Sequence, residues 1–307
     1  MTNSKNGAAR SVDAALPLRS KAVLITGAGR GIGEAYARLC ADLGARVFLV
    51  DRNPDTVSAV SEEIVQKGGK ASWSRCDVSD PADASAAVDA CVSVYGRIDG
   101  LVNNAAVYAI GDVGELDDET CRRMVEVNVL GVIYLTHATI RAMRRGRGRG
   151  RGGSIVNVTS GAQAGIPGVS VYGATKGAVA SFTYGVAVDL AGTDIRINAM
   201  SPLAETSMTK DGRVYREQRG EPYLPTRLPT ISDNAAAVAY LLSDHAADVR
   251  GQVVRVDPNG LSLMAHPGLL PSTLQPGSAW TFAAVREAFE RSLASKQVPL
   301  GVVPASF

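Results

Sequence analysis

Short apolar runs alternate along the chain with longer segments in which apolar residues recur at helical spacing. The runs lie at residues 22–26, 46–51, 70–76, 98–104, 154–160, 195–201 and 252–257. The longer segments lie at residues 31–44, 55–67, 80–95, 118–145, 172–191 and 233–243. Strands this apolar, separated by helices, are typical of a parallel sheet that is covered on both faces. Because right-handed crossovers make such a sheet doubly wound, the pattern predicts an α/β fold, a three-layer α/β/α sandwich around a parallel sheet of about seven strands.

Two stretches lie outside this pattern, one at each end of the chain. Residues 1–20 are polar and without periodicity, which predicts a mobile N-terminal tail. Residues 21–265 carry the alternating pattern and are expected to form a single domain. The C-terminal extension, residues 266–307, contains one apolar helical face formed by Phe282, Val285, Phe289 and Leu293. We expect this helix to dock on the domain or on a neighbouring subunit rather than to act as a substrate lid.

The composition excludes several classes of protein. The chain has 307 residues, 46% of them hydrophobic, which is ordinary for a globular protein. Its net charge of +2 gives no overall reason to expect nucleic acid or an anionic membrane as a partner. The N-terminus has no apolar signal-peptide core, and no stretch approaches the ~20 apolar residues that span a bilayer. We therefore expect a cytoplasmic protein with no membrane partner.

The cysteines and histidines show no spacing typical of a disulfide framework or a metal site. Cys40, Cys76, Cys91 and Cys121 form no C-x-x-C pair, and the three histidines are far apart in the sequence. This pattern favours reduced cysteines that pack in the interior, and it predicts no metal site.

An arginine and glycine run, residues 144–153, reads RRGRGRGRGG. Arginine binds phosphate and stacks on bases, which is the chemistry of an RNA tether. The run is short, lies between a predicted helix and a predicted strand, and has no interleaved aromatic residue. These features favour a solvated loop whose cations complement the negative end of the preceding helix, and no nucleic-acid partner is expected.

Candidate cofactor chemistry begins at residues 26–33, TGAGRGIG, directly after the first apolar run. The glycines fit the pattern T-G-x-x-x-G-x-G and not the G-x-G-x-x-G fingerprint. Between a strand and a helix, such a turn aims backbone N–H groups at the mouth of the helix, where the dipole favours a pyrophosphate. Gly27 permits the tight turn, while Gly31 and Gly33 let a ligand and the strand approach without a Cβ between them.

Asp51 ends the second apolar run, 24 residues after Gly27. Near this spacing, an acidic side chain meets the hydroxyls of the adenosine ribose. Because a carboxylate accepts hydrogen bonds from hydroxyl groups and repels a 2′-phosphate, Asp51 favours NAD over NADP. NADP remains an alternative cofactor because of Arg30 and Arg52, since a nearby guanidinium can bind the 2′-phosphate.

Tyr172 and Lys176 are four residues apart, so they share one face if their segment is helical. A phenol with a pKa near 10 is a poor base at neutral pH, but a nearby ammonium group and a cationic nicotinamide ring favour the phenolate. Tyr172 is therefore the candidate general acid and base for an alcohol and carbonyl pair. This spacing alone is common on helices, so the assignment depends on the surrounding motifs.

With these motifs in this order, residues 21–260 resemble the short-chain dehydrogenase/reductase family, which has a Rossmann fold. The resemblance implies a catalytic tetrad of Asn128, Ser160, Tyr172 and Lys176. The cofactor-binding residues that it implies are Gly27, Arg30, Gly31, Ile32, Gly33, Asp51, Arg52, Asp77, Val78, Asn104, Tyr172, Lys176 and Thr206. Among these, Asp77 and Val78 match the pair that contacts adenine in the family.

The same resemblance implies a role for each residue of the tetrad. Tyr172 would exchange the hydroxyl proton, and Ser160 would hydrogen-bond the substrate oxygen. Lys176 would lower the pKa of the phenol and hold the nicotinamide ribose. The backbone of Asn128 would hold a water that links the lysine to solvent, and Thr206 would meet the carboxamide of the cofactor.

Three positions depart from the family pattern. Ser160 precedes Tyr172 by 12 residues where the family usually has 13, so Thr159 holds the expected spacing. A one-residue deletion in the intervening loop is the simpler account, because VTS aligns with the strand end, and Ser160 is favoured. Ala106 and Leu203 stand where the family usually has glycine, and neither change removes a catalytic group.

The implied activity is hydride transfer between NAD and a secondary alcohol or ketone, as in an NAD-dependent alcohol dehydrogenase or ketoreductase. An NADPH-dependent carbonyl reductase is the alternative enzyme, and a regulator that senses NAD without chemistry is the alternative class of protein. Because all four tetrad residues are present, an enzyme is favoured. By analogy with the family, a substrate lid would lie at about 203–230. The family pairs the helices expected at 118–145 and 172–191, so a homodimer or homotetramer is expected.

Overall fold

The computed structural model describes residues 16–145, 152–220, 228–258, 260–268, 281–296 and 301. Four expected segments lie partly outside these ranges. They are the N-terminal tail at residues 1–15, the arginine and glycine run at 146–151, the lid at 221–227, and the C-terminal extension at 269–280, 297–300 and 302–307.

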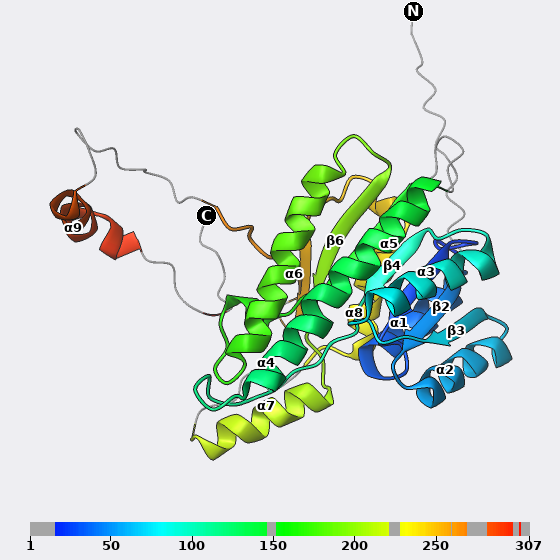
Figure 1. Ribbon diagram of the computed structural model, residues 1–307, viewed down its shortest axis with the longest axis horizontal. Helices are drawn as coiled ribbons and strands as arrows, with labels where there is room; N and C mark the ends of the chain where they lie inside the picture. The colour runs from blue at the N-terminus through cyan, green and yellow to red at the C-terminus, as the bar shows by residue number, and fades with distance from the viewer. Residues whose placement is uncertain are drawn as a thin grey trace, which may run out of the picture.

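The described residues form a central sheet of eight strands in the order β3-β2-β1-β4-β5-β6-β7-β8 (Figure 1). The strands are β1 (Ala22–Thr26), β2 (Arg46–Asp51), β3 (Lys70–Arg75), β4 (Gly100–Asn103), β5 (Gly153–Val158), β6 (Ile195–Ser201), β7 (Val253–Asp257) and β8 (Gly260–Leu263). The first seven pair in parallel, and β8 pairs antiparallel with β7. The strand order reverses between β1 and β4, which confirms the predicted doubly wound sheet.

The helices of the described residues are α1 (Gly31–Asp42), α2 (Pro54–Gln66), α3 (Pro81–Tyr95), α4 (Asp118–Val125), α5 (Gly131–Arg145), α6 (Ser170–Asp189), α7 (Ser207–Gln218), α8 (Ile231–Leu242) and α9 (Phe282–Arg291). Local sequence signals start several of them. Asn53 and Asp80 accept hydrogen bonds from the first turns of α2 and α3, each of which has proline at its first position. None of the helices in the described ranges is long and apolar enough to span a bilayer.

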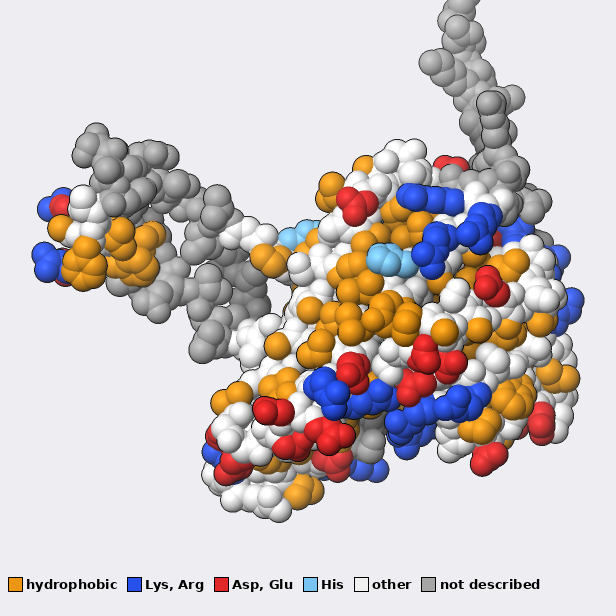
Figure 2. Space-filling model, viewed as in Figure 1, with side chains coloured by type: hydrophobic (Ala, Val, Ile, Leu, Met, Phe, Trp, Pro, Cys, Tyr) orange, Lys and Arg blue, Asp and Glu red, His pale blue; other side chains and the backbone are white. Residues whose placement is uncertain are grey.

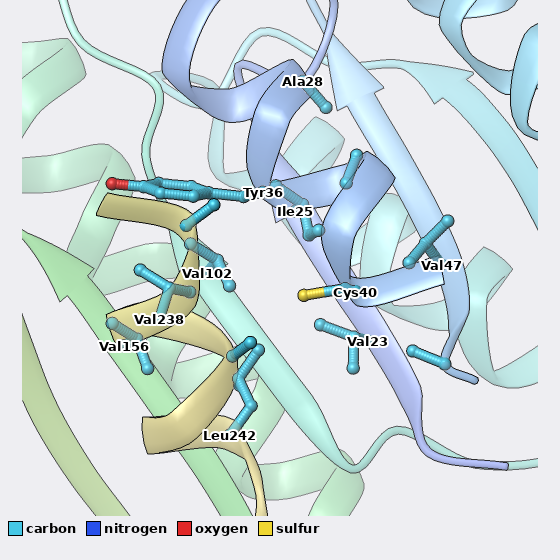
Figure 3. Close-up of a cluster of buried hydrophobic side chains, with 14 of the residues drawn as sticks. Val23, Ile25, Ala28, Tyr36, Cys40, Val47, Val102, Val156, Val238 and Leu242 are labelled. Atoms are coloured by element: carbon cyan, nitrogen blue, oxygen red, sulfur yellow. The ribbon is translucent and has the colours of Figure 1, made fainter. Parts of the chain in front are cut away.

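Helices cover both faces of the sheet and enclose two apolar cores. On one face, α1, α2 and α8 pack over alternate strand residues, and Figure 3 shows members of this core: Val23, Ile25, Ala28, Tyr36, Cys40, Val47, Val102, Val156, Val238 and Leu242. On the other face, α3, α5 and α6 pack over intervening residues such as Leu24 and Phe48. Successive side chains of a strand point to opposite faces, so both faces of this sheet are interior, as the apolar runs predict.

The cysteines belong to the interior of this fold. Cys40, Cys76 and Cys91 are buried free thiols, and Cys121 is a partly buried one. Burial raises the pKa of each of the three buried thiols to about 12. They therefore stay protonated and serve as packing residues, which agrees with their scattered spacing.

The packed domain begins before residue 21. Leu18 is fully buried, and its N–H donates to the Leu43 carbonyl over 3.0 Å. Leu18 thus helps to anchor residues 16–20, which the composition predicts to be part of the tail, against the end of α1.

Two elements lie where the pattern predicts none. Helix α7 lies in the segment expected to form the lid, and β8 extends the sheet by one antiparallel strand. All four residues of β8 are exposed, including Leu261 and Leu263, so the strand lacks the apolar character of the buried strands. In addition, a π-helical segment, Glu126–Leu130, divides the helix predicted at 118–145 into α4 and α5.

The predicted C-terminal helix is present as α9, but it does not dock on the described part of its own domain. Phe282 is 85% exposed, and Val285 and Phe289 are also exposed. In Figure 1, α9 lies apart from the sheet and its covering helices. Further along, the Gly301 N–H donates to the Ala164 carbonyl over 2.8 Å, so this residue lies against the loop that precedes α6. Docking of α9 on a neighbouring subunit stays a prediction.

Candidate active site

Most of the predicted cofactor residues lie at the carboxyl ends of β1, β2, β3 and β4, and the strand order reverses between β1 and β4. Gly27 and Gly31 both have a φ of +62°, a left-handed conformation that favours glycine. Helix α1 begins here with no side-chain hydrogen bond from its N-cap residue, Arg30. Side chains do cap α2, α3, α4, α7, α8 and α9. The first N–H groups of α1 therefore fit a pyrophosphate, which would replace the side-chain cap.

Gly33 allows close packing between this turn and the one after β4. A Cβ at residue 33 would lie 2.1 Å from the Gly27 carbonyl oxygen and 2.4 Å from Asn104 Nδ2. Asn104 Nδ2 donates to the carbonyls of Thr26 and Gly27 over 3.0 and 3.1 Å. The Thr26 hydroxyl oxygen accepts the N–H groups of Asn104 and Ala105, both at 2.9 Å. Asn104 thus holds the glycine turn against the turn after β4, and the absence of a side chain at Gly33 leaves room for this contact.

Asp51 lies at the end of β2 directly beside the glycine turn. One carboxylate oxygen accepts the Gly29 N–H at 3.1 Å, and the other accepts the Asn53 N–H at 3.0 Å. These bonds fix the carboxylate at the edge of the turn, where a ribose hydroxyl would meet it. Arg30 and Arg52 are exposed on the same turn and strand end, and Ile32 packs its side chain against the core beneath α1.

Asp77 and Val78 follow β3 at the next strand end. Arg123 of α4 donates to the Asp77 carboxylate at 3.0 Å, and the Ser79 hydroxyl also donates to it. Burial by itself would raise the pKa of Asp77, but the hydrogen bonds from Ser79 and Arg123 hold it below its ordinary value. Val78 is buried, and Gly131 at the start of α5 leaves room for its side chain.

Asn128 lies in the π-helical segment and is fully buried. Its side-chain oxygen accepts the Val107 N–H at 2.9 Å, while its amide nitrogen donates to the Val107 carbonyl at 2.8 Å and to the Thr175 hydroxyl at 3.0 Å. The side chain therefore joins the loop after β4 to α6, the helix that carries Tyr172. Both polar atoms of the Asn128 side chain are thus engaged in holding these two elements together.

Lys176 is almost completely buried, with 2% of its surface exposed. Its ammonium group donates to the Val158 carbonyl at the end of β5 over 2.8 Å. Burial lowers the pKa of Lys176 to about 8. One helical turn away, Lys176 Nζ lies 5.6 Å from the centre of the Tyr172 ring, so the two residues share the face of α6 that the spacing predicts.

Tyr172 is 6% exposed, and the Ser160 hydroxyl lies within hydrogen-bonding reach of its phenol oxygen. Burial raises the pKa of Tyr172 to about 12, and the hydrogen bond with Ser160 opposes that rise. At neutral pH Tyr172 is therefore a phenol, because burial disfavours its charged form more than the Ser160 hydrogen bond favours it.

Ser160, and not Thr159, faces the tyrosine. The Thr159 hydroxyl donates to the Met200 carbonyl of β6 at 3.2 Å and is buried there. Ser160 Oγ accepts the Ala162 N–H at 3.2 Å and starts the short 3₁₀ turn Gly161–Ala164. Of the two candidates, Ser160 is thus the one beside Tyr172, and the one-residue deletion in the loop to α6 stays a prediction.

The space around Tyr172 has apolar walls. Met124 and Ala162 are buried with it, and Tyr108, Ile166, Val169 and Met208 are among the partly buried residues that pack against this cluster. Tyr108 and Met208 were not among the predicted site residues. An aromatic residue shortly after the asparagine turn, at the carboxyl end of β4, is the signal that would have indicated Tyr108.

Thr206 is the N-cap of α7. Its hydroxyl oxygen accepts the Thr209 N–H at 3.3 Å, and the Thr209 hydroxyl in turn accepts the Thr206 N–H at 2.7 Å. This capping box fixes the start of the helix that lies over the site. Among the described residues, no group of three or more His, Cys, Asp or Glu side chains has the arrangement of a metal site.

The doubly wound sheet defines the class of protein, an α/β protein with a Rossmann-like fold, and Tyr172 and Lys176 lie on one face of its helix α6. Residues 21–215 match the profile of the short chain dehydrogenase family, and the chain belongs to this family. The cyclopentanol dehydrogenase of Comamonas sp. is 36% identical over 245 residues, which cover 78% of this chain and 96% of that protein. The cyclohexanol dehydrogenase of Acinetobacter sp. is 35% identical over 241 residues, covering 78% and 94%.

Solved structures agree with this assignment. A 3-ketoacyl-(acyl-carrier-protein) reductase from Brucella melitensis, complexed with NADH, is 36% identical with a TM-score of 0.70, over 78% of this chain and 98% of that one. A short chain dehydrogenase from Mycobacterium avium is 26% identical with a TM-score of 0.81, over 94% of this chain and 99% of that one. The family assignment and the Rossmann fold implied by the sequence motifs are thereby confirmed.

Proposed function

We propose that this chain is an NAD-dependent alcohol dehydrogenase that acts on compact secondary alcohols and the corresponding ketones. The observation that carries the proposal is the convergence of Ser160 and Lys176 on the buried Tyr172, at the same edge of the sheet as the glycine turn. An acid and base for a hydroxyl proton, a hydrogen-bond donor for the oxygen and a buried cation then lie within one cleft.

In the direction of oxidation, Tyr172 removes the hydroxyl proton while Ser160 donates a hydrogen bond to the substrate oxygen. Lys176 holds positive charge beside the phenol, and Asn128 contributes by fixing α6 to the loop after β4. When bound, the nicotinamide supplies the acceptor for the hydride that leaves the carbinol carbon. The carbon loses a hydride, the oxygen loses a proton, and a carbonyl group remains.

The raised pKa of Tyr172 favours its role as a proton donor in the reverse direction, ketone reduction. Oxidation needs the phenolate, which is favoured by more positive charge than Lys176 alone provides. An oxidised nicotinamide carries such a charge. The proposed site is therefore suited to oxidation only when that cofactor is bound.

The proposed substrate class follows from the residues that pack around Tyr172. Tyr108, Ile166 and Met208 offer apolar surface beside Tyr172, which suits an alcohol with a compact apolar body. The relatives from Comamonas and Acinetobacter are named for cyclopentanol and cyclohexanol, and this supports a cyclic secondary alcohol here.

A panel of alcohols tests the proposal. The purified chain is incubated with NAD⁺ or NADP⁺ and with cyclic secondary, linear secondary and primary alcohols, and formation of the reduced cofactor is followed by absorbance. We expect the highest kcat/KM for cyclic secondary alcohols with NAD⁺. In the reverse assay, ketones are incubated with NADH or NADPH. The proposal would be overturned, and the NAD-sensing regulator favoured, if no secondary alcohol gave reduced cofactor and no ketone led to oxidation of the reduced cofactor.

Asp51 is proposed to select NAD over NADP. The Asp51→Ala variant is expected to lose about 10- to 100-fold of its preference in kcat/KM, because the ribose hydroxyls lose a charged acceptor and a 2′-phosphate is no longer repelled. Titration with both cofactors measures the ratio. Asp55→Ala, which removes an exposed acid from the first turn of α2, is the matched control and should keep the wild-type ratio. If the ratio of kcat/KM for NAD to that for NADP were unchanged in the Asp51 variant, other residues would have to distinguish the two cofactors at the ribose.

NADPH-dependent ketone reduction is the second candidate activity. Arg30 and Arg52 are both exposed at the cofactor end of the sheet, and a guanidinium there would bind a 2′-phosphate. The relative from Brucella melitensis is named as a reductase and is complexed with NADH, so it supports the direction of reduction and not the choice of NADPH. The same titration separates the candidates, since a preference for NADP⁺ in the wild-type protein would select this one.

The outer surface of α5 and α6 is the proposed subunit interface. Figure 2 shows apolar side chains gathered over these helices, and Val188 near the end of α6 is 75% exposed. An apolar surface of this kind is typical of an interface between copies of a chain. Light scattering on the eluting protein is expected to give two or four times the chain mass of 32.0 kDa, and a monomer would contradict the interface.

A further inference from the structure

Helix α7 presents one face to the candidate active site. Met208, Asp211 and Tyr215 are three and four residues apart, so they lie on the same side of this helix. Met208 packs in the apolar cluster around Tyr172. The Tyr215 ring lies so close to Gly168 that a Cβ at residue 168 would be 2.4 Å from it. The helix therefore covers both Tyr172 and the loop that leads to it.

Between these two contacts, Asp211 meets a residue from the other side of the cleft. The Tyr108 hydroxyl, in the loop after β4, donates a hydrogen bond to the Asp211 carboxylate. Desolvation and this carboxylate raise the pKa of Tyr108 to about 12, so the phenol keeps its proton and remains the donor. The hydrogen bond between Tyr108 and Asp211 therefore joins the loop after β4 directly to the covering helix.

The ring of Tyr108 also reaches the acid and base. The rings of Tyr108 and Tyr172 pack edge to face, with centres 6.3 Å apart and planes at 72°. Asn128 supports the same loop from below, since it holds both backbone groups of Val107. One side chain thus touches the reacting tyrosine with its ring and the covering helix with its hydroxyl.

We propose that Tyr108 is a specificity-determining and positioning residue: its hydroxyl latches α7 over the site through Asp211, and its ring limits the room for substrate beside Tyr172. The latched state favours alcohols with a compact apolar body, because Tyr108 and Met208 then border the same space. Entry of substrate requires the latch to open, since α7 also covers the loop before Tyr172. The specificity part rests on the proposed function, whereas the latch does not.

Three variants and one control test the latch. Tyr108→Phe keeps the ring and removes the hydroxyl, Asp211→Asn removes the charge of the acceptor, and a double variant combines them. Glu217→Gln, six residues further along α7 and exposed, is the matched control. Hydrogen exchange of residues 207–218, followed by mass spectrometry on the free protein, reports opening of α7 without any need for turnover. Steady-state kinetics with cyclohexanol and with a bulkier bicyclic alcohol report specificity.

For each single variant we expect hydrogen exchange in α7 to quicken by about three- to tenfold. This is the effect expected when one partly exposed hydrogen bond to a charged group is lost. The double variant should exchange no faster than the faster single variant, because both changes break the same link. KM for cyclohexanol should rise about three- to tenfold with kcat within about twofold, and the preference for cyclohexanol over the bicyclic alcohol should fall.

Three results would overturn the proposal. Unchanged exchange in both single variants, or strictly additive changes in the double variant, would exclude the latch. Quickened exchange with unchanged KM and unchanged preference would exclude the role in specificity. If the wild-type chain turns over no alcohol or ketone, the proposed function fails, and the exchange measurement still decides on the latch.

Discussion

Replacing Tyr172 by phenylalanine is expected to lower kcat for alcohol oxidation by about 10²- to 10⁴-fold, the range over which a positioned acid and base contributes. The variant keeps the ring that packs against Met124 and Ala162, so the fold and the apolar wall remain. It loses only the oxygen that exchanges a proton with the substrate. NADH affinity, measured by fluorescence titration, should stay within a few fold, because the glycine turn and Asp51 are untouched.

Tyr240→Phe is the control for this prediction. Tyr240 is half exposed on α8, and its hydroxyl donates to the His245 carbonyl, away from the cleft. Its removal should leave kcat unchanged. Turnover of Tyr172→Phe near the wild-type rate would show that another group moves the proton, and the assignment of the acid and base would then be wrong.

The sheet could be predicted because its strands are buried on both faces. Val23 and Ile25 enter one core while Leu24 enters the other, so the strand is apolar throughout and stands out in the sequence. Strand β8 has no such requirement, since its residues are exposed at the edge of the sheet. It depends on pairing with β7, a tertiary contact that hydrophobic patterning does not reveal.

Helix α7 was missed for a similar reason. Its sequence, SMTKDGRVYREQ, has few apolar residues, because one side packs on the site and the other meets solvent. The threonines at residues 206 and 209 form its capping box, a signal that hydrophobic periodicity does not use. The family resemblance predicts a substrate lid in this segment and gives no secondary structure for it.

The candidate site was predictable where its geometry is local. Tyr172 and Lys176 are one helical turn apart, so α6 alone brings them together. The choice between Thr159 and Ser160 depends on the register at the end of β5, which the sequence does not fix. In the structure, the Thr159 hydroxyl donates a hydrogen bond to a carbonyl of β6, so it is not available to Tyr172. The contact of Tyr108 with Asp211 joins residues 103 positions apart, a separation at which single-sequence patterns carry no information.

Replacing Lys176 by methionine is expected to abolish most turnover and to stabilise the free protein. At neutral pH the folded chain must bury an ammonium group that makes a hydrogen bond to the Val158 carbonyl, and burial lowers the pKa of Lys176 from 10.5 to about 8. Methionine fills a similar volume without charge. We expect a gain of about 1 to 3 kcal/mol in the free energy of unfolding at pH 7. Replacing a residue that is placed for function at the cost of stability often gives such a gain.

The pH dependence of this gain separates charge burial from better packing. Between about pH 8 and pH 10.5 the unfolded wild-type chain binds a proton at Lys176 that the folded chain does not, so wild-type stability from this group rises with pH in that window. The advantage of the methionine variant should therefore be largest below pH 8 and disappear towards pH 10.5. Urea unfolding at several pH values measures it, with Lys67→Met at an exposed site as the control. A gain that is constant with pH would show that packing, and not the buried charge, sets the stability at this position.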